Sequence, residues 1–118
     1  MICRLWHGWT AAENAEAYGA YLTEELFPRL ARELGGRGYR GFHILRRADG
    51  SEVGFVTMTW FDSLESVRAF AGPEYETPVI TAKAAALLSR YEDRALHYDL
   101  ASATSIDSGN EGGGESGS

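Results

Sequence analysis

A strand that passes directly into a helix, between Glu52 and Ala71, is the feature that most constrains the fold of this chain. The strand part alternates between two sets of β-branched and aromatic side chains: Phe55, Thr57, Thr59 and Phe61 on one face, and Val56, Met58 and Trp60 on the other. Such alternation is typical of a strand whose two faces are both at least partly covered. We therefore predict a strand over residues 53–61.

The helix that follows is marked at both of its ends. Asp62 and Ser63 offer side-chain oxygens to a first helical turn, and Glu65 stands at the capping-box distance from Asp62. Apolar side chains then recur every three or four residues, until Gly72 and Pro73 interrupt the pattern. The pattern predicts a helix that ends just before the Gly-Pro pair.

The N-terminal third of the chain predicts a second strand and a long helix. Residues 2–9 alternate with large apolar groups on both faces, which favours a central strand. Thr10 and Glu13 have the capping-box spacing and predict the start of a helix. Pro28 lacks an N–H, so we expect this helix to end or kink near Phe27.

The remaining segments predict two more strands and a short helix. Residues 39–47 should pair antiparallel with the 53–61 strand, because the intervening Asp49-Gly50 is a hairpin signal. Thr77 is expected to cap a short alanine-rich helix, and residues 91–100 predict a final strand.

This order of elements predicts an α+β domain over residues 1–101, ferredoxin-like βαββαβ, with a four-stranded antiparallel sheet and its helices on one face. The other face of the sheet is then open. If Phe55, Phe61 or Trp6 lie there, the apolar area is too large for a small monomer to leave in water. Two sheets packed face to face about a twofold axis cover such a surface, so we expect a homodimer.

Composition and charge exclude several classes of protein. The 118 residues carry a formal net charge of −6, half of it in the Gly-, Ser- and acid-rich tail over residues 102–118, which we expect to be disordered. This balance gives no reason to expect a nucleic-acid or membrane partner. The single cysteine, Cys3, suits a reducing compartment, and neither a signal peptide nor a membrane span is visible. We therefore expect a cytoplasmic protein.

Four segments of the chain resemble the antibiotic biosynthesis monooxygenase superfamily, whose members are dimeric α+β barrels. They are RLWHGWT, GFHILRR, VTMTWFDSLESVRAFAG and HYDL, and the resemblance covers residues 1–100. It implies the fold of that superfamily. The superfamily includes cofactor-independent oxygenases of polyketide quinones, heme-degrading enzymes, quinol monooxygenases and many members with no assigned activity. The fold alone does not choose among these activities.

The heme-degrading branch of the superfamily is a poor match at its functional positions. That branch has an Asn on the first strand, where this chain has His7 or Gly8. It has a Trp in the second helix, where this chain has Phe70 or a neighbour, and a His after that helix, where this chain has Pro78 or Val79. These departures weigh against heme degradation. The polyketide branch matches no better residue by residue, so no catalytic residue transfers from either.

Oxygenation without a cofactor sets requirements that can be compared with the residues present. The substrate is a phenol that loses a proton and passes an electron to dioxygen, so the protein must supply a base, donors for the anion and a dry aromatic cavity. His7 is the candidate base, and Tyr75, in a loop that could cover a cavity, is the candidate for orienting the substrate. Trp60, His43 and Trp6 are candidates for binding it. Packing in the core or on the surface is the structural alternative for each of the five.

The other basic residues are expected to serve structure. Arg4, Arg46 and Arg47 should pair with carboxylates rather than bind an anionic substrate, and His97 should lie at a sheet surface. The three histidines fall one to a strand without metal-ligand spacing, so we expect no metal and no cofactor.

Three hypotheses about function remain. The first is a cofactor-independent monooxygenase that acts on a small aromatic, quinone or polyketide-type metabolite. The second is a non-catalytic dimeric module that binds a small hydrophobic ligand or heme. The third is a dimeric scaffold whose pocket is filled by its own side chains. A cavity between sheet and helices, and the residues that open into it, separates the first two from the third.

Overall fold

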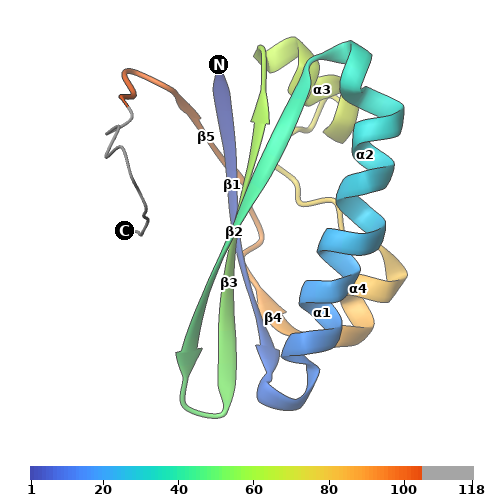
Figure 1. Ribbon diagram of the computed structural model, residues 1–118, viewed down its shortest axis with the longest axis vertical. Coiled ribbons are helices and arrows are strands. Elements are labelled where there is room, and N and C mark those ends of the chain that lie inside the picture. The colour runs from blue at the N-terminus through green and yellow to red at the C-terminus, as the bar shows by residue number, and fades with distance from the viewer. Residues whose placement is uncertain (105–118) are drawn as a thin grey trace, which may run out of the picture.

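The computed structural model describes residues 1–104 and shows an antiparallel sheet with helices packed against one face (Figure 1). The strands are β1 (Ile2–Ala11), β2 (Tyr39–Asp49), β3 (Glu52–Phe61), β4 (Leu88–Tyr91) and β5 (Leu96–Asp99). The helices are α1 (Ala15–Tyr21), α2 (Phe27–Leu34), α3 (Leu64–Ala71) and α4 (Ala82–Leu87), and within residues 1–104 none has the length and apolar character that crossing a membrane requires. From residue 105 on, the predicted disordered tail lies outside the described residues.

The predicted α+β class with an antiparallel sheet is confirmed, and the arrangement is compatible with a ferredoxin-like fold. The sheet order is β2-β3-β1-β4, and β5 pairs with β1 as well. β1 is central, as predicted: β3 pairs with it from Ile2↔Phe61 to Ala11↔Glu52, while β4 and β5 pair with other parts of it. Gly50, with φ +67°, makes the predicted turn between β2 and β3.

The prediction of one continuous last strand over residues 91–100 is wrong, so the sheet formed by residues 1–104 has five strands rather than four. Between β4 and β5 the backbone makes hydrogen bonds outside the regular ladder. The Ala95 N–H donates to the carbonyl of Glu76 (2.7 Å), and the Glu92 carbonyl accepts from Trp6 Nε1 (2.8 Å). These long-range bonds interrupt the strand, and the side chains of residues 91–100 give no sign of them.

The first helical region begins and winds differently from the prediction. Thr10 is not a cap, because β1 continues to Ala11 and a 3₁₀ turn over Ala12–Asn14 leads into α1. Of the predicted end or kink near Phe27, the end is wrong, because helical structure continues through α2 to Leu34. A π-helical turn over Leu22–Leu26 connects α1 to α2, and its wider winding precedes Pro28, which has no N–H for a regular helical bond.

Of the two residues predicted to cap α3, Ser63 is confirmed and Asp62 is wrong, and the cap of α4 lies four residues beyond the predicted Thr77. Ser63 Oγ accepts from the N–H of Ser66 (3.2 Å), while Asp62 binds Arg40 through two hydrogen bonds instead. Thr81, and not Thr77, caps α4 by accepting from a backbone N–H. The stretch before it therefore stays extended and free to line a cavity.

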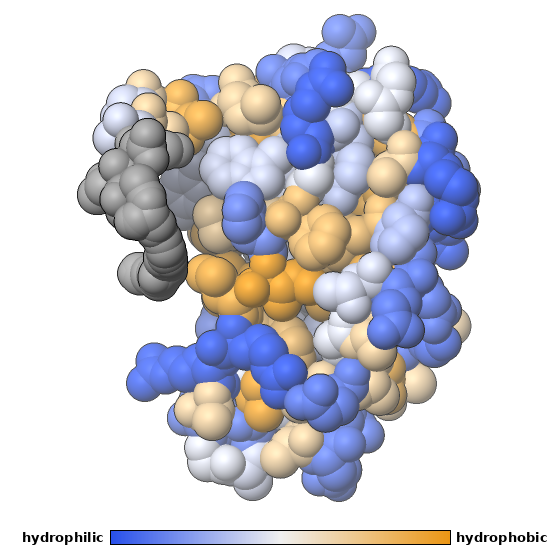
Figure 2. All heavy atoms as spheres, in the orientation of Figure 1, coloured by the Kyte–Doolittle hydropathy of each residue, from blue (hydrophilic) through white to orange (hydrophobic). Residues whose placement is uncertain are grey.

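The core lies between the sheet and the helices. Phe55, Phe61 and Trp6 all face the helices, so they are not the residues that make the open face apolar. The open face instead carries other large side chains: Leu5, Leu45, Val56, Met58, Trp60, Leu96 and Tyr98. Figure 2 shows apolar residues gathered in the middle of the face seen there, with hydrophilic residues along the helix side.

Candidate functional site

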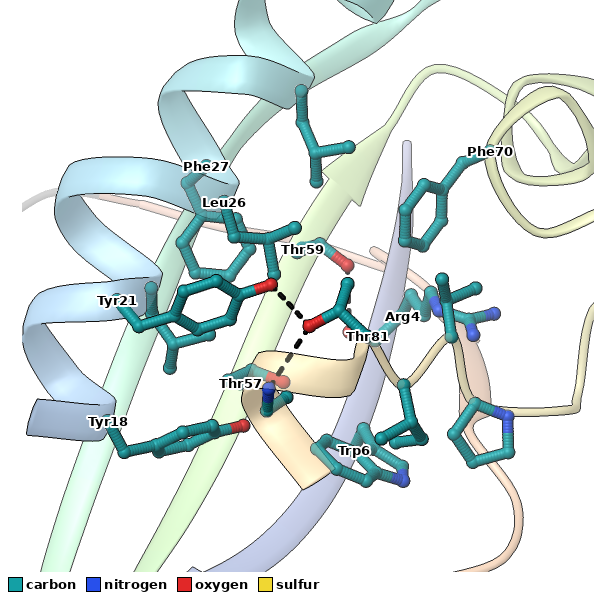
Figure 3. Close-up of a pocket in the computed structure, with 16 residues that line it drawn as sticks. Arg4, Trp6, Tyr18, Tyr21, Leu26, Phe27, Thr57, Thr59, Phe70 and Thr81 are labelled. Carbon is teal, nitrogen blue, oxygen red and sulfur yellow. Dashed lines mark hydrogen bonds between the residues drawn. The ribbon is translucent and has the colours of Figure 1, made fainter. Parts of the chain in front are cut away.

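A cavity lies between the helix-facing side of the sheet and the first helical region, and the segment that precedes α4 closes it (Figure 3). Sixteen residues line it, and five of them are aromatic: Trp6, Tyr18, Tyr21, Phe27 and Phe70. The room for the centres of water molecules is about 60 Å³, enough for a few waters. The hypothesis of a pocket filled by its own side chains is therefore not favoured.

Strand periodicity positions the floor of the cavity. Arg4 and Trp6 are two residues apart on β1, so both side chains leave the same face of the sheet. Their partners across the ladder, Thr59 and Thr57 of β3, are buried and bring two hydroxyl groups to the same floor.

The opposite wall is built by the π-helical turn and by the segment before α4. Leu22 and Leu26 lie in the turn, and π-helical turns occur often at functional sites. The Tyr21 hydroxyl is 2.6 Å from Thr81 Oγ1, which also caps α4 (Figure 3). This pair joins α1 to the closing segment across the top of the cavity.

Arg4 is the charged group of the cavity, and only 5% of it is exposed. Its guanidinium donates to the carbonyls of Tyr75 and Thr77, contacts His97 Nε2 at 3.1 Å and lies 5.3 Å from the centre of the Phe70 ring. Burial lowers the pKa of Arg4 to about 10. Within residues 1–104 no carboxylate forms an ion pair with Arg4, so the prediction that it pairs with one is wrong.

His97 reaches Arg4 from β5 and is partly buried on the helix-facing side of the sheet. Burial is the main cause that lowers the pKa of His97, and the positive charge of Arg4 lowers it further, against the opposing effect of Glu76. The imidazole is therefore held neutral and accepts a hydrogen bond from Arg4. His97 also lines a separate surface pocket beside Tyr75, so it stands between that pocket and the cavity.

Among the five residues predicted for the site, Trp6 lines the cavity. Its ring forms part of the wall, and its indole N–H is already engaged by the Glu92 carbonyl. His7, the neighbouring residue on β1, points to the opposite face of the sheet. There it stacks on Trp9, with the ring centres 3.8 Å apart. The expectation that His7 opens into the cavity is wrong because adjacent strand residues face opposite sides.

Trp60 and His43 also lie on the open face of the sheet rather than in the cavity. Trp60 Nε1 donates to His43 Nδ1 at 2.9 Å, and the two rings meet edge to face. The structure thus brings these two predicted residues together, but on the side away from the helices. His43 is exposed and Trp60 is half-buried.

Tyr75 lies beside the cavity without lining it. Its carbonyl binds Arg4, its ring meets the edge of His97 at 5.1 Å, and Arg68 lies over the ring at 5.4 Å. The loop therefore acts on the site through its backbone, and the Tyr75 hydroxyl is not one of the groups that face the cavity.

The titratable groups in the cavity wall are Arg4, Tyr18 and Tyr21. Burial, and to a lesser extent Tyr21, raises the pKa of Tyr18 well above its usual value, so its hydroxyl stays protonated. The lining residues include neither a histidine nor a carboxylate. Within residues 1–104 no group of three His, Cys, Asp or Glu side chains is placed to hold a metal ion.

No protein-family model and no curated protein matches this chain. Its chemistry therefore has to be argued from the cavity itself. The arrangement can hold a small, partly apolar molecule, offer it hydroxyl groups from the floor and stabilise a negative charge on it through Arg4.

Proposed function

We propose that the protein is a cofactor-independent monooxygenase-type protein that acts on a small aromatic hydroxyl compound. The observation that supports this is an aromatic-walled cavity with a buried cation, Arg4, that has no carboxylate partner within residues 1–104. A positive charge in a dry site lowers the pKa of a neighbouring acid and stabilises its anion. The resemblance to the monooxygenase superfamily is compatible with this chemistry but does not choose it among the activities of that superfamily.

In the proposed reaction the substrate itself is the reductant. Its anion passes one electron to dioxygen, and the substrate radical and superoxide then combine at a ring carbon that carries hydrogen. Loss of water from that peroxide leaves a carbonyl group, so a hydroxyaromatic compound becomes a quinone. Arg4 stabilises the anion, while Trp6 and Phe70 exclude water from it.

A ring-sized substrate requires the cavity to widen. An apolar cavity that holds benzene measures about 150 Å³, and this one offers about 60 Å³. We expect the segment over residues 78–81 to move when the cavity widens, because this part of the lining belongs to neither the sheet nor a helix. It is held by the Tyr21–Thr81 hydrogen bond, and the loop before it is held by Arg4.

The proposed assembly is a homodimer of two ferredoxin-like βαββαβ domains, in which the open faces of the two sheets pack against each other. Leu45, Leu96 and Tyr98 on the open face are 54%, 47% and 52% exposed. They are continuous with Trp60, Met58 and Val56 of β3 and Leu5 of β1. A surface of this kind on a small chain favours association, and a second copy presents the same surface.

The experiment that tests the proposed function is oxygen uptake with a hydroquinone substrate, in the presence of a chelator and without flavin. We expect formation of a hydroxyquinone, with its new oxygen atom derived from dioxygen, well above the buffer rate. We also expect a fall of at least tenfold for Arg4→Met and no comparable fall for Arg47→Met, which removes an exposed charge. Uptake no faster than in buffer would contradict an oxygenase.

The second candidate is a non-catalytic binding module. The absence of histidine and carboxylate side chains from the lining favours it, because no strong base is then at hand to remove a proton. It predicts saturable binding of an aromatic ligand, seen as a change in tryptophan fluorescence, with no oxygen uptake. Heme is not the expected ligand of such a module, because among residues 1–104 no histidine lines the cavity to bind its iron.

A further inference from the structure

The guanidinium of Arg4 has hydrogen-bond donors that the described residues do not use. Both hydrogens of Nη1 are engaged, one by the Tyr75 carbonyl and one by His97 Nε2, and Nη2 donates to the Thr77 carbonyl at 3.1 Å. Within residues 1–104, Nε–H and the second hydrogen of Nη2 have no acceptor. Because Arg4 lines the cavity, a molecule bound there can reach its side chain.

The charge of Arg4 is also uncompensated. The partners it has are two neutral carbonyls and a neutral imidazole, which supply partial charges only. The carboxylate on the same loop, Glu76, is engaged by Arg94. A buried cation without an opposite charge is costly unless an anion completes the site, and a ligand can supply that anion.

We propose that the cavity binds its ligand as an aromatic carboxylate, with the two carboxylate oxygens on the Nε–H and Nη2–H of Arg4. This inference rests on the proposed function and names its substrate class as hydroxyaryl carboxylates. A planar carboxylate matches two donors of one guanidinium. The ring then lies among Trp6, Phe27 and Phe70, and the hydroxyls of Thr57 and Thr59 face the ring substituents.

A carboxylate fits this site better than a phosphate. A phosphate brings a third oxygen and nearly a second charge, while the lining offers one cation. The apolar surface that surrounds Arg4 also calls for a ligand with an apolar body. Both features favour a single planar head group attached to a ring.

The test compares ligands that differ in charge and little in shape. Benzoate and benzamide are titrated by calorimetry under nitrogen, with acetate and acetamide as the smaller pair. We expect benzoate to bind at least tenfold more tightly than benzamide. We expect Arg4→Met to abolish this preference and Arg47→Met to preserve it. Equal binding of the two ring compounds, or a preference that survives Arg4→Met, would overturn the inference.

A second measurement needs no variant and so does not depend on the folding of Arg4→Met. Only 5% of Arg4 is exposed, so the ¹⁵N–¹H signal of its Nε–H can be followed by NMR. Benzoate should shift this signal by a hydrogen-bonding change that benzamide does not produce. An Nε–H signal whose chemical shift does not change on adding benzoate would contradict the proposed carboxylate position at Arg4.

The outcomes separate this inference from the proposed function. Binding under nitrogen involves no oxygen chemistry, so a benzoate preference without oxygen uptake supports the anion site and removes the oxygenase. The opposite outcome is oxygen uptake that is equally fast with hydroquinone and with 2,5-dihydroxybenzoate. It supports the oxygenase and removes the preference for a carboxylate.

Discussion

At the scale of single residues, Arg4 combines two roles that are usually separate. Its bonds to the carbonyls of Tyr75 and Thr77 fix a loop that has little regular structure of its own. The same guanidinium places a positive charge in the cavity and adds to the effect of burial, which is the main cause of the lowered pKa of His97. Any change at Arg4 therefore acts on the loop, the cavity and the histidine together.

The lowered pKa of His97 predicts a dependence of stability on pH. In the unfolded chain His97 takes up a proton near its ordinary pKa of 6.5, whereas the folded protein resists that proton because of burial and Arg4. The free energy of unfolding should therefore decrease as the pH falls through this value and below it. His97→Gln removes the titrating group, so the variant should lose less stability than the unaltered protein between pH 7.5 and pH 5.5.

Urea unfolding at the two pH values measures this difference. Arg4, Glu76 and Tyr75 face His97 and are unchanged in the variant, as are the other two histidines. An equal loss of stability in both proteins would show that His97 is not held neutral.

At the scale of elements, the junction between α2 and β2 depends on close contact with α3. Gly38 has φ +102°, and a Cβ atom placed on it would lie 2.7 Å from Ser66 Cβ. Gly38→Ala should therefore lower the free energy of unfolding by about 2 kcal/mol or more, through both backbone strain and overlap. Gly36→Ala is the matched control, because nothing lies within 4 Å of the added atom. Similar urea midpoints for the two variants would contradict this account.

The contact between α1 and the segment before α4 is a second element-scale feature. Tyr21→Phe removes the hydroxyl that binds Thr81 and leaves the ring in place. We expect a loss of about 1 kcal/mol in the free energy of unfolding and faster entry of ligand by stopped-flow fluorescence. Tyr91→Phe, at a residue 45% exposed, should change neither. An unchanged rate in Tyr21→Phe would mean that ligand enters elsewhere.

Sequence reasoning succeeded where local chemistry decides the structure. Gly50 sets the β2–β3 turn, and Gly72 ends α3 at the predicted residue. It failed where distant segments decide, as at Ala95, whose bond to Glu76 interrupts the last strand. The five predicted site residues were chosen by chemical type, and of these only Trp6 lines the cavity. A usable signal was present in the pattern: Arg4 shares a strand face with Trp6, so its charge lies on a face that packs against helices.

At the scale of the whole molecule, the two faces of the sheet have different tasks. One face is covered by helices (Figure 1) and holds the cavity. The other carries exposed apolar side chains of β2 and β5 and half-buried ones of β3. Association through the open face would leave the cavity wall untouched. Dimer formation and ligand binding can therefore be changed separately by substitution.

Leu45→Glu tests the proposed dimer. A charge on the paired faces should shift the solution mass to that of one chain, because it would be buried without a partner. Ala31→Glu adds the same charge on the exposed side of α2 and should leave the mass of the assembly unchanged. Light scattering after gel filtration measures both. A single-chain mass for the unaltered protein at micromolar concentration would rule out the dimer.

The break between β4 and β5 has a consequence for how the cavity opens. The Ala95 amide is bonded to Glu76, on the loop that Arg4 holds at Tyr75 and Thr77. An outward swing of that loop must release this amide to water. Deuterium uptake at the Ala95 amide would thus report how often this loop moves away and opens the cavity to solvent.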